Sequence, residues 1–560
     1  MNKKVLYLAM GVALVGTSSC SKKLGEFQSN YFNTTPTPLE TVGENVPATI
    51  TGNIPPKFMV KNAKVTATPI LEYLGGTTSG SPVIIQGENV LANGQVVSYN
   101  NGGTVQIPFN TQYIPEMEQS DLYLAFSVDQ KGKLYDLPRV KVGYGVIATS
   151  TLASAKTVTP AIAPDKFQRI INEKYNAEIM FLVNQAIIRQ NQIDAPDYVD
   201  FNKRLIEANA APNQEIVGIN IASTASPEGT LEFNTALAER REQVTTTFME
   251  NQLKKDKITN FGELTSSFTP EDWEGFQQLV EKSNIQDKDL ILSVLKMYKD
   301  PNQREQEIRN MSSVFDELAV EILPKLRYSK LQASINIIGK SDEELIKLFD
   351  TDPQALTEDE ILYVATLTND NTRKMQVYKK ASEIYPNSYR AVNNLGVIKY
   401  VTGDYSGAKS DFDKAKRLNP SSKEVDLNLG LIELINGNYN KANELIGSAA
   451  GVPEASDALG VYYLTQGEVA KANTSFGNAK TNNAALAKIL AKDYSAAQNI
   501  LSAVPTPDGT TYYLAAIVSA RTNNETGVIS NLKKAIQLDN SLLNRAKKDL
   551  EFSGYNLAGI

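Results

Sequence analysis

The spacing of apolar residues changes along the chain, from alternation in the first part to a helical period of three to four residues further on. Between 47 and 150, short alternating runs such as Ala63 to Thr68 and Leu122 to Val128 are separated by clusters of Gly, Asn and Pro. Such runs are typical of half-buried β-strands joined by turns. The pattern therefore predicts an N-terminal all-β, sandwich-like domain over 47–150.

A strand, a tight loop and a helix follow one another in the middle of the chain. Glu215 to Ala222 alternates apolar residues, Ser226-Pro-Glu-Gly supplies turn chemistry, and from Asn234 the helical spacing places Leu237 and Arg241 on one face. An Arg early on such a helix can hold a ligand carboxylate through two parallel hydrogen bonds. The alternative is that the Arg belongs to a solvated helix face.

The C-terminal third is repetitive. Ala391 to Pro420 carries Leu395-Gly396, Ala408 and Phe412 at positions that recur in the following segments, and this pattern resembles the tetratricopeptide repeat. We expect about six units in an all-α solenoid over 355–545. Small residues let the two helices of a unit approach closely, and large apolar residues fill the space between them.

A solenoid of this kind offers a concave groove, in which an extended or helical segment of a protein partner could bind. The alternative is that the groove leucines only pack between neighbouring units. The residues expected to line the groove are Arg390, Asn393, Tyr400, Leu427, Leu431 and Leu434.

The run from Asn234 to Arg241, after a strand and a loop that ends in Gly229, resembles the peptidoglycan-binding domain of the OmpA family. The resemblance implies a central α/β OmpA-like domain over 165–340, with a helical insertion at about 256–327 that ordinary family members lack. The chain is thereby predicted to be multidomain.

In the OmpA family a loop Asp binds the ammonium of the diaminopimelate in the stem peptide, and an Arg at the position of Arg241 binds its carboxylate. Asn234 matches the Asn of the family motif, but Ser226 stands where the family has Asp. A hydroxyl cannot replace the ion pair. Either Glu228 takes that role from a shifted position, or this chain has lost tight binding to peptidoglycan.

The N-terminus resembles a lipoprotein signal peptide over 1–20. A basic stub and a short apolar run precede Cys20, the only cysteine, which is the expected lipid attachment point. The resemblance implies an outer-membrane protein that faces the periplasm. Polar residues over 21–46 predict a flexible tether, and the Thr/Ala/Pro segment over 151–164 predicts a linker.

Composition narrows the possible functions. The net charge is −7, and no basic stripe indicates nucleic-acid binding. The chain has no histidine, so it lacks the commonest general base and metal ligand. We therefore expect no enzymatic activity, no cofactor and no metal site.

Two hypotheses remain, and the overall architecture resembles lipoproteins of Bacteroidetes that attach outer-membrane machinery to the wall. In the first, the chain binds peptidoglycan through Arg241 and holds an outer-membrane or periplasmic protein through its repeats. In the second, it is an adaptor of outer-membrane assembly or secretion, such as type IX secretion, whose OmpA-like fold no longer binds the wall.

Overall fold

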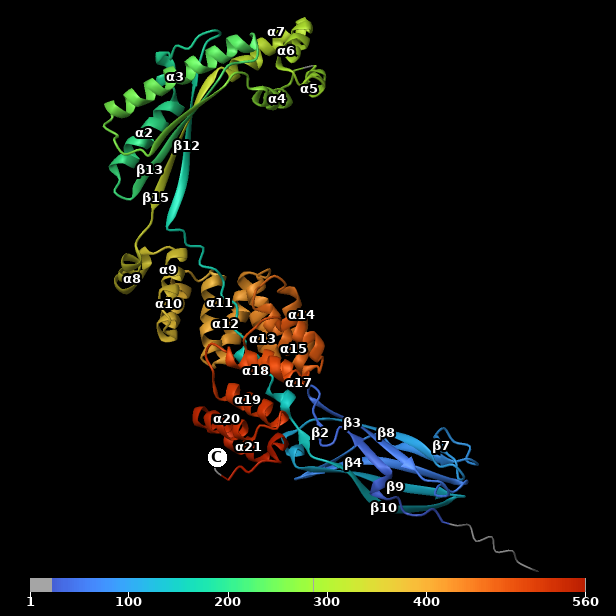
Figure 1. Ribbon diagram of the computed structural model, residues 1–560. Helices are drawn as coiled ribbons and strands as arrows, with labels where there is room; N and C mark the ends of the chain where they lie inside the picture. The colour runs from blue at the N-terminus through green and yellow to red at the C-terminus, as the bar shows by residue number, and fades with distance from the viewer. Residues whose placement is uncertain (1–22, 286, 559) are drawn as a thin grey trace, which may run out of the picture. The chain divides into compact units, whose positions relative to one another are not determined.

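The computed structural model describes residues 23–285, 287–558 and 560, and the chain forms two compact units (Figure 1). Unit 1 combines the chain up to Pro164 with Asp370–Ile560, and unit 2 is Asp165–Asn369. The predicted signal peptide and Cys20 lie outside the described residues. Among the residues that are described, no helix is long and apolar enough to cross a membrane.

The N-terminal part of unit 1 is a β-domain in which two sheets share one core. One sheet has the order β1-β3-β8, and the other has the order β10-β9-β4-β6-β7, with β5 paired to β4. Val46 and Ile50 of the first sheet pack with Val65 and Phe126 of the second. The strands are β1 (Phe32–Thr35), β2 (Leu39–Glu40), β3 (Asn45–Ile54), β4 (Ala63–Tyr73), β5 (Gly76–Ser79), β6 (Val83–Gly87), β7 (Gln95–Val97), β8 (Gly103–Gln112), β9 (Ser120–Gln130), β10 (Lys133–Tyr144) and β11 (Val146–Ile147).

The predicted tether over 21–46 is wrong from residue 24 onward, because this stretch belongs to the β-domain. Leu24 and Phe27 are buried in its core, and the Phe27 ring stacks on Phe126 at 4.3 Å between centroids. β1 and β3 pair as antiparallel strands. The polar composition of 21–46 concealed the few apolar side chains that anchor it.

The C-terminal part of unit 1 is a helical repeat region. Five consecutive antiparallel helix pairs follow α10 (Asn371–Ile384) and end before α21 (Leu542–Lys548). The sequence predicts about six repeat units from residue 355; α10 belongs to unit 1, whereas residue 355 belongs to unit 2. The pairs are α11 (Tyr389–Val401) with α12 (Tyr405–Leu418), α13 (Lys423–Ile435) with α14 (Tyr439–Ser448), α15 (Ala455–Thr465) with α16 (Val469–Phe476), α17 (Asn482–Leu490) with α18 (Tyr494–Ser502), and α19 (Gly509–Arg521) with α20 (Glu525–Leu538).

The repeat motif has the packing role expected of it. A Cβ placed on Gly396 would lie 2.8 Å from the Phe412 ring, and one on Gly460 would lie 2.5 Å from the Phe476 ring. A side chain at either glycine would therefore push the two helices of the pair apart. Gly403, between α11 and α12, has a φ of 89°, which a residue with a side chain rarely adopts.

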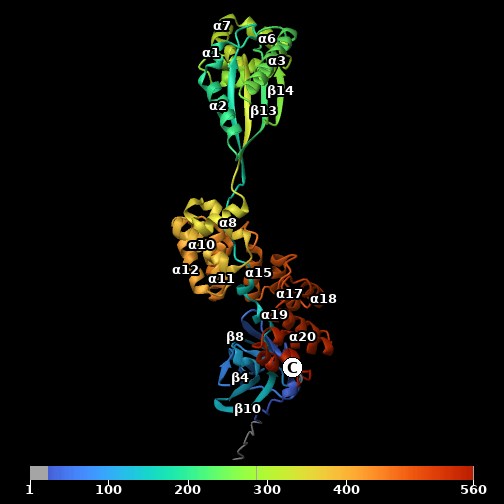
Figure 2. The same ribbon diagram turned by 90° about the vertical axis from the view of Figure 1, so that its left-hand side faces the viewer.

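Unit 2 contains a four-stranded sheet of order β12-β15-β13-β14, in which only β13 and β14 are parallel neighbours. Helices α2 and α3 cover the same face of this sheet (Figures 1 and 2) and share a core with Ile179, Ile219 and Leu331. The elements are β12 (Ile170–Met180), α1 (Gln190–Ile193), α2 (Pro196–Ala210), β13 (Gln214–Thr224), α3 (Leu231–Lys255), β14 (Glu263–Thr269) and β15 (Tyr328–Ile338), followed by α8 (Asp342–Thr351) and α9 (Glu358–Val364).

Two boundaries of unit 2 differ from the sequence prediction. The apolar run from Ala177 to Ile188 predicts the first strand, but β12 ends at Met180, where it pairs with Tyr328 at the start of β15. The insertion predicted over 256–327 includes β14, which is part of the sheet. The helices of the insertion are α4 (Trp273–Lys282), α5 (Lys288–Met297), α6 (Pro301–Asn310) and α7 (Ser312–Glu321), and they have a core of their own.

Candidate functional site

The predicted wall-binding residues lie where β13 passes into α3. β13 ends at Thr224, and α3 begins at Leu231 after Thr230, whose side chain accepts a hydrogen bond from the Phe233 backbone N–H. The buried face of α3 carries Asn234, Leu237, Ala238 and Arg241, because these residues recur at the helical period. Both predicted α3 side chains therefore point inward, toward the sheet and the loops around it.

Arg241 is fully buried, with 0% of its surface exposed. Its guanidinium donates to three backbone carbonyls: Nη1 to Thr224 at 2.8 Å, Nε to Gln185 at 3.0 Å and Nη2 to Leu182 at 3.2 Å. It also lies 5.1 Å from the centre of the Phe181 ring. The group that was expected to face a ligand instead fixes the loop after β12 against the end of β13.

Burial, and after it the nearby positive charge of Arg327, lowers the pKa of Arg241 to about 10, against the opposing effect of Glu228. At neutral pH the guanidinium keeps its charge. A buried cation is tolerated only when its donors are satisfied, which explains why three carbonyls converge on it.

Glu228 forms a two-pronged ion pair with Arg327, at 3.0 Å from Nε to Oε1 and 2.9 Å from Nη2 to Oε2. Ser226, only 3% exposed, donates to Glu228 Oε1 at 2.7 Å. Arg309 of α6 donates to the Glu228 backbone carbonyl. The carboxylate predicted to receive a ligand ammonium is thus already paired, with an arginine that the sequence analysis did not single out.

Asn234 connects the loop to the insertion. Its Nδ2 donates to the Gly229 carbonyl at 2.9 Å and to Glu271 Oε1 at 2.9 Å. The other oxygen of Glu271 accepts from Trp273 Nε1 at 2.9 Å. The insertion therefore holds the loop through Glu271, Arg309 and Arg327, none of which belongs to the motif.

The structure thus brings Ser226, Glu228, Asn234 and Arg241 together, but it satisfies their polar groups internally. A ligand carboxylate could reach Arg241 only after displacing backbone carbonyls, and a ligand ammonium would compete with Arg327 for Glu228. Within the described residues, no group of three or more acidic or cysteine side chains is placed to hold a metal ion.

The six predicted groove residues of the repeats are all buried. The exposed fractions of Asn393 and Tyr400 are 0% and 1%. Residues 153–164, here called the strap, which the sequence predicts to be a linker, run past the repeat helices (Figure 1) and contact several of these side chains. Tyr400 donates its hydroxyl hydrogen to the Ala155 carbonyl at 2.5 Å, and Arg390 Nη1 donates to the Pro164 carbonyl at 3.3 Å. The linker prediction for 151–164 is therefore wrong, since the strap packs against the repeats.

The three groove leucines belong to the core that the strap and the repeats share. Leu427, Leu431 and Leu434 of α13 pack in one cluster that also contains Ala155, Val158 and Ala161 of the strap. The sequence analysis offered two roles for these leucines, partner binding and packing between units. The structure shows a third role, which is contact with a distant segment of the same chain. The exposed surface of these leucines is too small for another ligand while the strap is in place.

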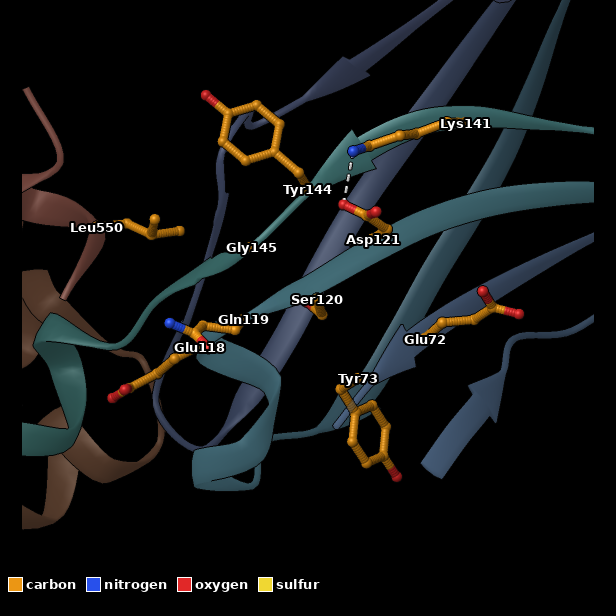
Figure 3. Close-up of a pocket in the computed structure, with 10 residues that line it drawn as sticks. All are labelled: Glu72, Tyr73, Glu118, Gln119, Ser120, Asp121, Lys141, Tyr144, Gly145 and Leu550. Carbon is orange, nitrogen blue, oxygen red and sulfur yellow. Dashed lines mark ion pairs between the residues drawn. The ribbon is translucent and has the colours of Figure 1, made fainter. Parts of the chain in front are cut away.

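A separate surface hollow of about 460 Å³ lies at the end of the β-domain. Figure 3 shows Lys141 paired with Asp121, at 2.7 Å, with Tyr144 beside them and Leu550 at the margin. Glu72, on another side of the hollow, is paired with Arg139. These two ion pairs neutralise the charges of Lys141, Asp121, Arg139 and Glu72.

The described part of the chain thus combines a β-rich region, an α/β unit and a C-terminal array of helix pairs whose motif residues resemble those of the tetratricopeptide repeat. No protein-family profile and no curated protein sequence matches the chain. Among solved structures, a tetratricopeptide repeat protein from Parabacteroides merdae is similar over 37% of this chain and 91% of its own, at 14% identity and a TM-score of 0.30.

Two further similar structures are PilF of Pseudomonas aeruginosa and yeast Tom70. PilF covers 38% of this chain and 99% of its own, at 16% identity and a TM-score of 0.29. Tom70 covers 71% of this chain and 67% of its own, at 13% identity and a TM-score of 0.26. These values are low, so the repeat assignment rests on the helix pairs and motif residues of the chain itself.

Proposed function

We propose that this chain is a non-catalytic, lipid-anchored protein scaffold of the outer membrane, which faces the periplasm and serves an assembly or secretion machinery. In this proposal its OmpA-like unit does not bind the wall through α3. The observation that carries the choice is the complete burial of Arg241 against the carbonyls of Leu182, Thr224 and Gln185.

The scaffold role is supported by the helical repeats, whose stacked pairs provide an extended surface for proteins rather than an enclosed reaction site. The absence of histidine from the sequence points the same way, because most general acid–base and triad chemistry depends on it. The lipid anchor is proposed from the sequence around Cys20. In an adaptor, the lipid anchor would hold the protein at the outer membrane and the repeats would bind its protein partners.

A peptidoglycan tether is the second candidate, and one observation favours it. Ser226, Glu228, Asn234 and Arg241 gather at the end of one strand, as the resemblance to the OmpA family implies. For the wall peptide to bind, Arg327 would have to release Glu228. A charge-assisted, two-pronged pair is among the stronger contacts in proteins, so this release opposes binding.

Peptidoglycan binding separates the two candidates. We expect the full-length protein to remain in the supernatant when purified peptidoglycan is sedimented, because neither charge of the site is available to diaminopimelate. Sedimentation followed by quantification of protein in the pellet measures this. The tether would be supported instead if the protein were pelleted and Glu228→Ala released it.

A matched control for that experiment is Glu232→Ala. Glu232 is an exposed acid in the first turn of α3, four residues after Glu228 in the sequence. Loss of one negative charge from this region would affect non-specific adsorption equally in both variants. Only a specific site would distinguish Glu228→Ala from Glu232→Ala.

Cys20→Ala is expected to move the protein from the membrane fraction to the soluble fraction. A single acyl chain gives only marginal membrane binding, so a lipoprotein is anchored by several, and Cys20 is the only cysteine of this sequence. Fractionation of cells followed by immunodetection measures the change, with Ser21→Ala as the control. Retention of Cys20→Ala in the membrane would contradict the lipid anchor.

A further inference from the structure

The strap occupies the groove of the repeats as an extended peptide ligand would. Its turn at Ala155–Thr157 contacts α13, and the turn just before the strap, Thr149–Leu152, contacts α15 and α17, so together they meet the first helices of three successive pairs. Its backbone then continues to Ala163, which α11 holds. One continuous stretch of chain thus crosses four helix pairs.

Three asparagines bind the strap, each through both backbone groups of a single residue. Asn428 accepts from the Ala161 N–H at 2.7 Å and donates to its carbonyl at 2.8 Å. Asn394 does the same for Ala163, at 2.8 and 2.9 Å. Asn483 does the same for Ser154, at 3.0 and 2.9 Å. Since every non-proline residue has these groups, the asparagines recognise an extended backbone and not a side chain.

Side-chain size supplies the selectivity that the asparagines lack. Ala155, Val158, Ala161 and Ala163 of the strap are small and buried, and Pro160 is buried with them. Between Ala161 and Ala163, Ile162 points away and is 43% exposed. This alternation is that of an extended chain. The chemistry of the groove therefore fits a neutral, extended segment with small residues at the positions that face the helices.

We propose that the groove is a binding site for extended peptides of this composition, that the strap keeps it closed, and that a partner segment enters only when the strap leaves. The proposal rests on the scaffold function and names the partner's chemistry. The buried asparagines support it: Asn393, Asn394 and Asn428 are at most 1% exposed, and without a backbone to bind they would lose hydrogen bonds at a buried site.

Covalent attachment explains why the strap excludes competitors. A segment joined to its site by a short connection acts at an effective concentration on the order of mM. A free peptide of the same sequence, added at a concentration well below that, cannot displace it. The intact protein is therefore expected to bind such a peptide at least about tenfold more weakly than a protein whose strap cannot seat.

The test uses a fluorescent peptide of residues 151–164 and full-length protein, with anisotropy as the measurement. The double variant Ala161→Arg with Ala163→Arg places a long, charged side chain at two buried alanine positions of the strap, so its strap cannot seat, and it should bind the peptide. The unmutated protein should bind the peptide at least about tenfold more weakly. Ile162→Arg is the matched control, because Ile162 is exposed, and it should behave like the unmutated protein.

A third substitution tests where the peptide binds. Adding Asn428→Ala to the double variant should weaken peptide binding at least about tenfold, because it removes both contacts of Asn428 to the backbone at the Ala161 position and leaves only that of Asn393 to the carbonyl. Absence of binding to a double variant with native circular dichroism would overturn the proposal. Equal binding to the unmutated protein would overturn the closure by the strap.

Hydrogen exchange of the unmutated protein tests the closure without any substitution. The amides of Ala161 and Ala163 should exchange as slowly as those of the α13 core, because both are buried and bonded to asparagine. Fast exchange at these amides would contradict a closed groove even if the double variant did not fold. None of these results depends on the membrane or the wall, so failure here is distinct from failure of the scaffold function.

Discussion

Replacing Arg241 by Ala is expected to lower the free energy of unfolding of unit 2 by about 3–5 kcal/mol. The guanidinium is fully buried, and it satisfies the carbonyls of Leu182, Thr224 and Gln185. A buried acceptor that loses its donor costs about 1–3 kcal/mol, and the loop after β12 would lose its attachment to α3. A ligand-binding arginine at the surface would have no such effect.

The only tryptophan of the chain makes this effect measurable in the full-length protein. Trp273 lies in unit 2, and its Nε1 donates to Glu271, which also binds Asn234 of α3. Denaturant unfolding followed by tryptophan fluorescence therefore reports on unit 2 alone. The midpoint should fall strongly for Arg241→Ala.

Arg240→Ala is the matched control, because Arg240 is the neighbouring arginine on the exposed face of α3. Its loss should change the free energy of unfolding by less than about 0.5 kcal/mol. Equal midpoints for the two variants would show that Arg241 does not stabilise the unit. In that case the guanidinium would again be available as a ligand group, and the tether would regain support.

Local patterns predicted most of the elements of this chain. Alternation identified the strands of the β-domain, and the helical period identified α3 and the repeat helices, because both depend on residues close in sequence. The same period also placed Arg241 on the face of Leu237, which is buried. The sequence thus indicated that Arg241 points inward, although a ligand role was inferred from the family motif.

The partners of the candidate site could not be predicted in the same way. Arg327, which binds Glu228, lies 99 residues further along the chain, at the end of the insertion. The carbonyls that bind Arg241 come from Leu182 and Gln185, in an apolar run that the sequence assigns to a strand. Backbone carbonyls leave no signature in a sequence, because every residue has one.

The strap was missed for a related reason. Its Thr/Ala/Pro composition is that of a flexible linker, and its hydrogen bonds to the repeats use its own backbone. The signal lay in the repeats, where Asn394 and Asn428 occupy the same position of α11 and α13, one repeat apart. A polar residue that recurs at a buried repeat position indicates a ligand that runs along the solenoid.

Phe412→Ala is expected to destabilise the repeats by about 3–5 kcal/mol. Phe412 has 0% of its surface exposed, and its ring faces Gly396, where even a Cβ would lie 2.8 Å away. Gly396 has no side chain with which to fill the cavity, and the neighbouring pairs restrict the approach of α11 and α12. The cavity term therefore adds to the lost burial of the ring.

Far-ultraviolet circular dichroism of the full-length protein during denaturant unfolding measures this effect. Leu418→Ala, on the same helix but 37% exposed, is the control and should cost less than about 1 kcal/mol. The Trp273 fluorescence transition should not move, because Trp273 lies in unit 2.

Each helix pair is stabilised mainly by its neighbours. Asn394 lies on α11, so loss of the pair α11–α12 should also release the strap from Asn394. A Phe412→Ala protein no less stable than Leu418→Ala would show that the Gly–Phe contact does not hold the pair together.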